Sequence, residues 1–140
     1  MAAYRQQCLF DAPMETVWRE VGDPNRYPAW AGEIVEVTGL DQVEEGARYR
    51  QTTKTPFGTS ATDFVVDTFD DLHEIQVRCT VSGYYMRWVL TGAADDTYAE
   101  VEIGMDPKHL GYRAIDTTVG RRWYRRTVED MLDRLRAVIR

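Results

Sequence analysis

The feature that most constrains the fold is a long alternation of apolar and polar residues between positions 33 and 105. In residues 74–81 every second residue is apolar, and residues 84–91 repeat the pattern after Gly83. A period of two is typical of strands that bury one face, and turn-forming pairs such as Asp70-Asp71 and Asp95-Asp96 separate the runs. We therefore predict an antiparallel meander of about six strands in this segment.

Other elements flank the meander. Residues 4–10 alternate and predict a strand, and Pro13 suits the first turn of a helix that follows it. One face of this helix carries its apolar residues, Met14, Val17, Trp18 and Val21. Gly22 is expected to close it in a left-handed conformation, and Asp23-Pro24 begins a second short helix. With a long helix at the end of the chain, the order predicts an α+β fold: a curved antiparallel sheet of about seven strands around that helix.

Length and charge exclude several classes of protein. The 140 residues fit one domain, residues 1–140, and 44% hydrophobic with 29% charged residues is an ordinary globular balance. The net charge of −6 argues against a nucleic-acid partner. No apolar run approaches the ~20 residues of a membrane span, so no integral membrane contact is expected. Without the pattern of a signal peptide, we expect a cytoplasmic protein with Cys8 and Cys79 as buried free thiols.

The C-terminal segment is basic although the chain is acidic. Residues 113–140 hold eight arginines and four acidic residues. A solvated helix face is the simpler interpretation, and a surface for a partner is the alternative. A homodimer is compatible with either interpretation.

The terminal helix predicts a cavity. At 100° per residue, one face collects the apolar side chains of Val128, Met131, Leu132, Leu135, Val138 and Ile139. Toward the start of the helix the same face carries small or polar residues, Ala114, Thr117, Gly120, Arg121 and Tyr124. If this face meets the sheet throughout, its first half leaves space for a ligand. Two alternatives stay open: the helix begins near Gly120, or Ile115, Val119 and Trp123 form the buried stripe instead.

The sheet is expected to supply the other wall of this cavity. Tyr84, Met86 and Trp88 share one strand face, Phe64 is expected to join them, and Tyr49 is a further candidate. Such residues are core where the helix covers them and pocket lining where it does not. The predicted ligand-binding residues are Tyr49, Phe64, Tyr84, Met86, Trp88, Thr117, Arg121 and Tyr124.

No catalytic or metal-binding motif stands out. The chain lacks a nucleophile elbow, a zinc-protease motif and a phosphate-binding loop. Its two histidines, His73 and His109, fall in different turns, so we expect no metal and no cofactor. His73 is expected in a solvated turn and His109 in an exposed loop, and the sequence identifies no catalytic residue.

The residues before the meander resemble a known superfamily. Ala12-Pro13-x-x-x-Val17-Trp18, followed by Asp23-Pro24-x-x-Tyr27-Pro28-x-Trp30, a meander and a terminal helix, resembles the helix-grip superfamily. This superfamily includes Bet v 1-like proteins, START domains and the polyketide cyclase/dehydrase family, and the resemblance covers essentially the whole chain. Tyr27-Pro28-x-Trp30 is also similar to the coenzyme Q-binding and RatA-like branch.

The resemblance implies binding of a small hydrophobic molecule, polyketide-, lipid- or quinone-like, in an internal cavity. Cyclase or dehydratase activity is the enzymatic option, with Arg121 steering a carboxylate or enolate and Tyr124 and Thr117 donating hydrogen bonds. A non-catalytic carrier, or a regulator, is the alternative. It would meet an acidic partner or a membrane through the arginine cluster Arg121, Arg122, Arg125 and Arg126. Arg121 itself is either a pocket group, a buried ion-pair member or a surface residue that packs only its methylenes inward.

Overall fold

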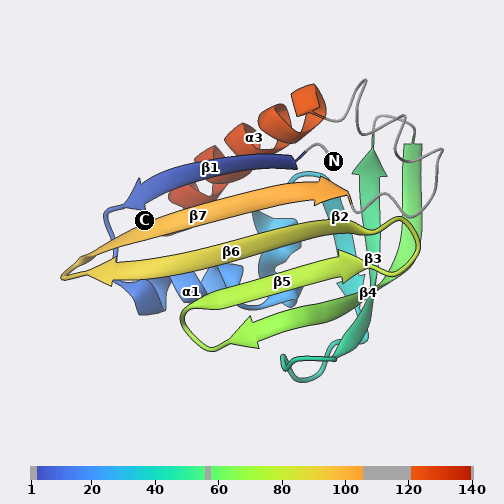
Figure 1. Ribbon diagram of the computed structural model, residues 1–140, viewed down its shortest axis with the longest axis horizontal. Helices are drawn as coiled ribbons and strands as arrows, with labels where there is room; N and C mark the ends of the chain where they lie inside the picture. Colours follow the sequence, from blue (N-terminus) through green and yellow to red (C-terminus); the bar gives the residue numbers. More distant parts are fainter. Residues whose placement is uncertain (1–2, 56–57, 106–120, 140) are drawn as a thin grey trace.

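The computed structural model describes residues 3–55, 58–105 and 121–139, which form one curved antiparallel sheet with helices on its inner side (Figure 1). The seven strands follow the order β1-β7-β6-β5-β4-β3-β2. Their bounds are Ala3–Phe10 (β1), Ile34–Thr38 (β2), Arg48–Thr55 (β3), Gly58–Asp70 (β4), Glu74–Cys79 (β5), Tyr84–Ala93 (β6) and Asp96–Met105 (β7). The helices are α1 (Met14–Val21), the 3-10 helix η1 (Pro24–Ala29) and α3 (Arg121–Ile139). The predicted α+β helix-grip architecture is confirmed.

The sheet changes direction within β4, and this curvature creates its inner side. The first half of β4 pairs with β3 and the second half pairs with β5. The register shifts between Val66 and Thr68, as a β-bulge does where a strand bends. As a result β2 and β3 run across the direction of β5, β6 and β7 (Figure 1). The inner face of the sheet therefore surrounds α1, η1 and α3.

Alternation along the strands decides which side chains face inward. On β6, Tyr84, Met86, Trp88 and Leu90 are buried on the inner face, as expected. Tyr85 is also buried, but it belongs to the outer face, where its hydroxyl donates to Glu102. Cys8 and Cys79 are buried free thiols, which confirms their prediction. His73 is exposed in the turn after β4, and His109 lies outside the described residues.

The helix α3 buries the face that its spacing predicted, except at Arg121 and Val138. The buried residues are Tyr124, Val128, Met131, Leu132 and Leu135. Val138 is 40% exposed, so its assignment to the buried face is wrong. Trp123, from the rival stripe, is only half-buried. In the last turn of the helix the side chain of Arg136 still reaches β1, where its guanidinium lies over the ring of Phe10 at 5.6 Å. No helix among the described residues has the length and apolarity of a membrane span.

Gly22 ends α1 for a reason different from the one expected. Its φ of −84° is right-handed, so the predicted left-handed conformation is wrong. A side chain is excluded because a Cβ at Gly22 would lie 2.4 Å from Cε2 of Trp18. The indole of Trp18 packs across the helix end, held by a hydrogen bond to Asp71. Glycine is thus required by packing and not by backbone conformation.

Gly22→Ala is therefore expected to lower the free energy of unfolding by about 1–3 kcal/mol, the usual range for overpacking. Chemical denaturation measures the loss. The same substitution in a Trp18→Leu background should have little effect, because the clashing ring is gone. An equal loss in both backgrounds would show that the ring of Trp18 is not what excludes a side chain.

Candidate functional site

The candidate site begins on the inner face of β3, where polar residues point into the protein. Tyr49, Gln51 and Thr53 alternate along this strand and are all buried. The amide of Gln51 donates from Nε2 to Oγ1 of Thr53 at 2.8 Å, which leaves its Oε1 without a partner among the described residues. Tyr49 stacks on Phe64 of β4 with ring centroids 5.7 Å apart. This strand therefore carries polar groups into a region that is otherwise aromatic.

The 3-10 helix η1 and the residue that follows it add two aromatic rings. Tyr27 lies in η1, Trp30 caps its end, and both are fully buried. Their ring centroids are 5.2 Å apart, and Trp30 meets Trp88 of β6 edge-on at 5.6 Å. The hydroxyl of Tyr27 donates to the carbonyl of Val21 at 2.7 Å. The indole N–H groups of Trp30 and Trp88 have no acceptor among the described residues.

Across from β3, Tyr84 stands at the start of β6, close to the start of α3. Its ring contacts that of Trp123 with centroids 6.1 Å apart, and Trp123 in turn meets Tyr124 at 5.7 Å. Burial raises the pKa of Tyr84 well above its usual value, and the charges of Glu33, Tyr124 and Tyr49 add to this effect. Tyr84 is therefore within electrostatic range of groups on η1–β2, β3 and α3.

Buried polar atoms without partners are the unusual property of this region. A native interior usually satisfies its buried polar groups, so each exception calls for an explanation. Six side-chain atoms among the described residues have no hydrogen-bond partner: Trp30 Nε1, Glu33 Oε1, Tyr49 OH, Gln51 Oε1, Tyr84 OH and Trp88 Nε1. They come from the segment between η1 and β2, from β3 and from β6, all on the inner side of the sheet. We call these six residues the inner polar cluster.

Glu33 is the ionisable carboxyl group of this cluster. It lies immediately before β2, and its carbonyl accepts a hydrogen bond from the backbone N–H of Lys54 at 2.7 Å. Burial, with a smaller contribution from nearby Asp130, raises the pKa of its carboxyl group to about 7, against the opposing effects of a backbone hydrogen bond and Arg134. At neutral pH this carboxyl group can donate or accept a proton.

The structure brings most of the predicted ligand-binding residues together. Six of them are buried in one core: Tyr49, Phe64, Tyr84, Met86, Trp88 and Tyr124. Arg121 is exposed at the first residue of α3, so its predicted place on the buried face is wrong. Thr117 lies outside the described residues. The interior that results is aromatic and carries a carboxyl group, whereas the sequence led us to expect a guanidinium.

Sequence reasoning missed Trp30, Glu33 and Gln51 as site residues. Gln51 had a usable signal, because it alternates with Tyr49 on the same strand. Trp30 belonged to the motif that carried the family resemblance, but its pairing with Trp88 joins segments far apart in the chain. Glu33 had no usable signal in the sequence, since a single glutamate before a strand is exposed in most proteins.

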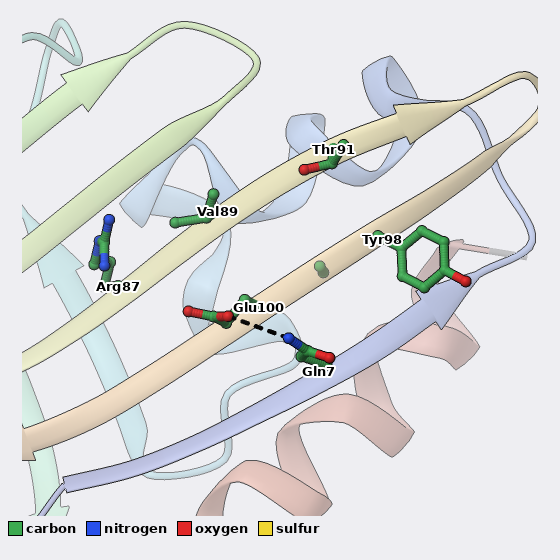
Figure 2. Close-up of a pocket in the computed structure, with 7 residues that line it drawn as sticks. Gln7, Arg87, Val89, Thr91, Tyr98 and Glu100 are labelled. Carbon is green, nitrogen blue, oxygen red and sulfur yellow. Dashed lines mark hydrogen bonds between the residues drawn. The ribbon is translucent and has the colours of Figure 1, made fainter.

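A hollow lies on the outer face of the sheet, over β1, β7 and β6 (Figure 2). Its volume is about 380 Å³, and its lining residues are Gln7, Arg87, Val89, Thr91, Tyr98, Ala99 and Glu100. Gln7 and Glu100 approach each other across it, 3.5 Å apart (Figure 2). This outer hollow is bordered by charged and exposed side chains and includes none of the inner polar cluster.

A curved sheet around a C-terminal helix, with unsatisfied polar atoms on the inner side, defines a protein of the helix-grip superfamily. The chain belongs to the polyketide cyclase/dehydrase and lipid transport family, whose model matches residues 1–140. No curated protein matches the chain. Family and fold together support a role in binding a hydrophobic ligand.

Solved structures share the fold at low sequence identity. TTHA0849 from Thermus thermophilus is 14% identical with a TM-score of 0.77, over 99% of this chain and 97% of that one. A START superfamily protein from Mycobacterium smegmatis is 15% identical with a TM-score of 0.73, over 98% and 96%. Ara h 8.0201 is 10% identical with a TM-score of 0.66, over 99% and 97%. These similarities establish the architecture and leave the ligand to be inferred from the site.

Proposed function

We propose that this protein binds a small, largely apolar molecule of polyketide, lipid or quinone type between the inner face of the sheet and α3. The observation that carries the proposal is the inner polar cluster: six buried polar atoms that have no partner among the described residues. Each such atom loses its hydrogen bond to water on folding, at a cost of about 1–3 kcal/mol. A ligand that supplies partners would recover this energy.

The surroundings of the cluster fit the same function. Binding sites for small molecules are mostly apolar with a few placed polar groups that fix orientation. Phe64, Met86 and Tyr124 provide apolar surface beside the cluster, and each is at most 2% exposed. Native mass spectrometry of gently purified protein tests the proposal directly, since a bound molecule should appear as a mass increment that organic solvent removes.

A matched pair of tyrosines provides a sharper test. Tyr84→Phe removes an inward hydroxyl of the cluster, while Tyr85→Phe removes the neighbouring outward hydroxyl that bonds Glu102. We expect Tyr84→Phe to weaken binding of 2-acetylnaphthalene about two- to tenfold, the value of one neutral hydrogen bond. Tyr85→Phe should leave binding unchanged. Quenching of tryptophan fluorescence measures both, and equal effects of the two variants would place the ligand elsewhere.

Cyclase or dehydratase activity is the second candidate, and Glu33 is the observation that favours it. Aldol-type cyclisation and dehydration both need a group that moves a proton, and such a group works best with a pKa near the working pH. Glu33, with its pKa near 7, meets this requirement, and the hydroxyl of Tyr84 lies within electrostatic range of it. Enzymatic turnover of a poly-β-carbonyl substrate that Glu33→Gln abolishes would favour the enzyme over the carrier.

A further inference from the structure

The charge of the interior carries information about the ligand. Among the described residues the buried charged side chains are Glu20 and Glu33, and no lysine or arginine is buried. Glu20 is satisfied by Arg26, whose Nη2 lies 2.8 Å from its Oε1. No ion pair joins Glu33 to another described residue at this distance, and its Oε1 is without a hydrogen bond among them. In the described part of the chain, Glu33 is therefore the buried acidic group with an unsatisfied oxygen.

Within residues 3–55, 58–105 and 121–139, the groups that face Glu33 do not supply a free cation. In these ranges Asp130 and Arg134 of α3 and Tyr84 of β6 are the charged and titratable side chains that interact with it. Arg134 is committed to Asp130, with its Nε 3.0 Å from Oδ2, and both side chains of this pair are more than half exposed. The guanidinium of Arg134 therefore stays at the surface of α3. It is still close to the backbone beside Glu33, because a Cβ at Gly32 would lie only 3.2 Å from its Cζ.

An isolated carboxylate in an apolar interior is far costlier than a neutral carboxyl group. Burial accordingly raises the pKa of Glu33 to about 7, so a large fraction of the protein carries the neutral acid near neutral pH. A neutral carboxylic acid has an O–H that needs an acceptor. The described residues around Glu33 Oε1 supply none.

We propose that the neutral carboxylic acid of Glu33 donates a hydrogen bond to a carbonyl or hydroxyl oxygen of the ligand, so that the cavity selects neutral oxygen-bearing molecules and rejects carboxylates. The proposal rests on the ligand-binding function proposed above and adds the ligand's charge state and polar group. The proposal reverses the expectation that Arg121 holds a carboxylate group of the ligand, because Arg121 is exposed.

The remaining atoms of the inner polar cluster agree with an acceptor-rich ligand. The indole nitrogens of Trp30 and Trp88 can only donate, and the hydroxyls of Tyr49 and Tyr84 can donate as well as accept. Gln51 Oε1 is the one atom of the cluster that can only accept. Donors therefore outnumber obligate acceptors, which suits ketone, quinone or ether oxygens. A carboxylate would instead place a second negative charge near Glu33.

Three naphthalenes of similar size test the inference, with tryptophan quenching as the measurement at about pH 6 and about pH 8.5. They are 2-acetylnaphthalene, 2-ethylnaphthalene and 2-naphthoate. If the ketone needs the neutral acid, its apparent affinity scales with the fraction of Glu33 that is protonated. With a pKa of about 7, the affinity for the ketone should fall about thirtyfold between the two pH values. The affinity for 2-ethylnaphthalene should change little, and 2-naphthoate should bind at least about tenfold more weakly than the ketone at about pH 6.

Variants at Glu33 separate a hydrogen bond from a general effect of pH. Glu33→Gln keeps a hydrogen-bond donor and does not titrate. At both pH values this variant should therefore bind 2-acetylnaphthalene within a few-fold of the affinity that the wild type shows at about pH 6. Glu33→Leu should lose the preference for the ketone over 2-ethylnaphthalene. Glu36→Gln, an exposed position on the adjacent β2, serves as the matched control and should behave as wild type.

Two results overturn the inference in different ways. If the ketone and the hydrocarbon bind equally well at both pH values, the cavity exists but Glu33 does not contact the polar group. If none of the three probes binds and native mass spectrometry shows no bound molecule, the proposed function fails and the inference fails with it.

Discussion

Trp18→Ala is expected to lower the free energy of unfolding by about 3–5 kcal/mol, the usual range for truncation of a buried tryptophan. The side chain is 8% exposed on the inner face of α1. Its ring packs against Phe69 with centroids 5.9 Å apart, and its Nε1 donates to Oδ1 of Asp71 at 3.0 Å. These contacts join α1 to the end of β4, 53 residues further along the chain. Alanine would leave a cavity at that junction.

Chemical denaturation monitored by circular dichroism measures this loss. Trp18→Phe keeps most of the ring and should lose clearly less, while Arg19→Ala on the exposed side of the same helix should change the free energy of unfolding by less than about 0.5 kcal/mol. A loss below about 1 kcal/mol for Trp18→Ala would mean that α1 does not bury this face. The large loss is expected whether or not the interior binds a ligand.

The fold could be predicted from the sequence because its signals are local and repeated. Alternation marks six strands between residues 33 and 105, and the structure places β2 to β7 there. Proline after Ala12 and after Asp23 marks the starts of α1 and η1, where the missing N–H is not needed. Each strand of a meander lies beside its neighbour in the chain, so the sheet order followed almost directly.

The site was harder to predict because burial of a charged residue depends on contacts between distant segments. Helical spacing placed Arg121 among buried residues, but it is the first residue of α3 and is exposed. Glu33 carries no periodic signal, yet it is buried and interacts with residues of β3, β6 and α3. The sequence predicted that Gly22 ends the helix in a left-handed conformation, whereas glycine is required there because a side chain would clash with the ring of Trp18. In each case a tertiary contact overrides the local pattern.

Enclosure of Glu33 also has a consequence for stability, which we expect to fall as pH rises. The pKa of its carboxyl group moves from an ordinary value of 4.5 to about 7 on folding. The folded protein therefore binds more protons than the unfolded chain between these values, and the free energy of unfolding declines as they are removed. The contribution of the neutral acid is fully present below about pH 4.5 and is lost once pH exceeds about 7. At 1.36 kcal/mol for each pH unit, the total loss is about 3 kcal/mol.

Glu33→Gln isolates this contribution from that of the other carboxyl groups, because glutamine keeps the shape and does not titrate. Between pH 5.5 and pH 8, a range above the sequence pI of 4.9, the free energy of unfolding of the wild type should fall by about 2 kcal/mol relative to that of the variant. The variant should consequently be the more stable protein at pH 8, since it removes a buried charge without a partner. Glu36→Gln, at an exposed position, should keep the pH profile of the wild type. Parallel profiles for wild type and Glu33→Gln would show that the carboxyl group reaches water or a cation in the folded protein, and the neutral acid would then be unavailable to any ligand.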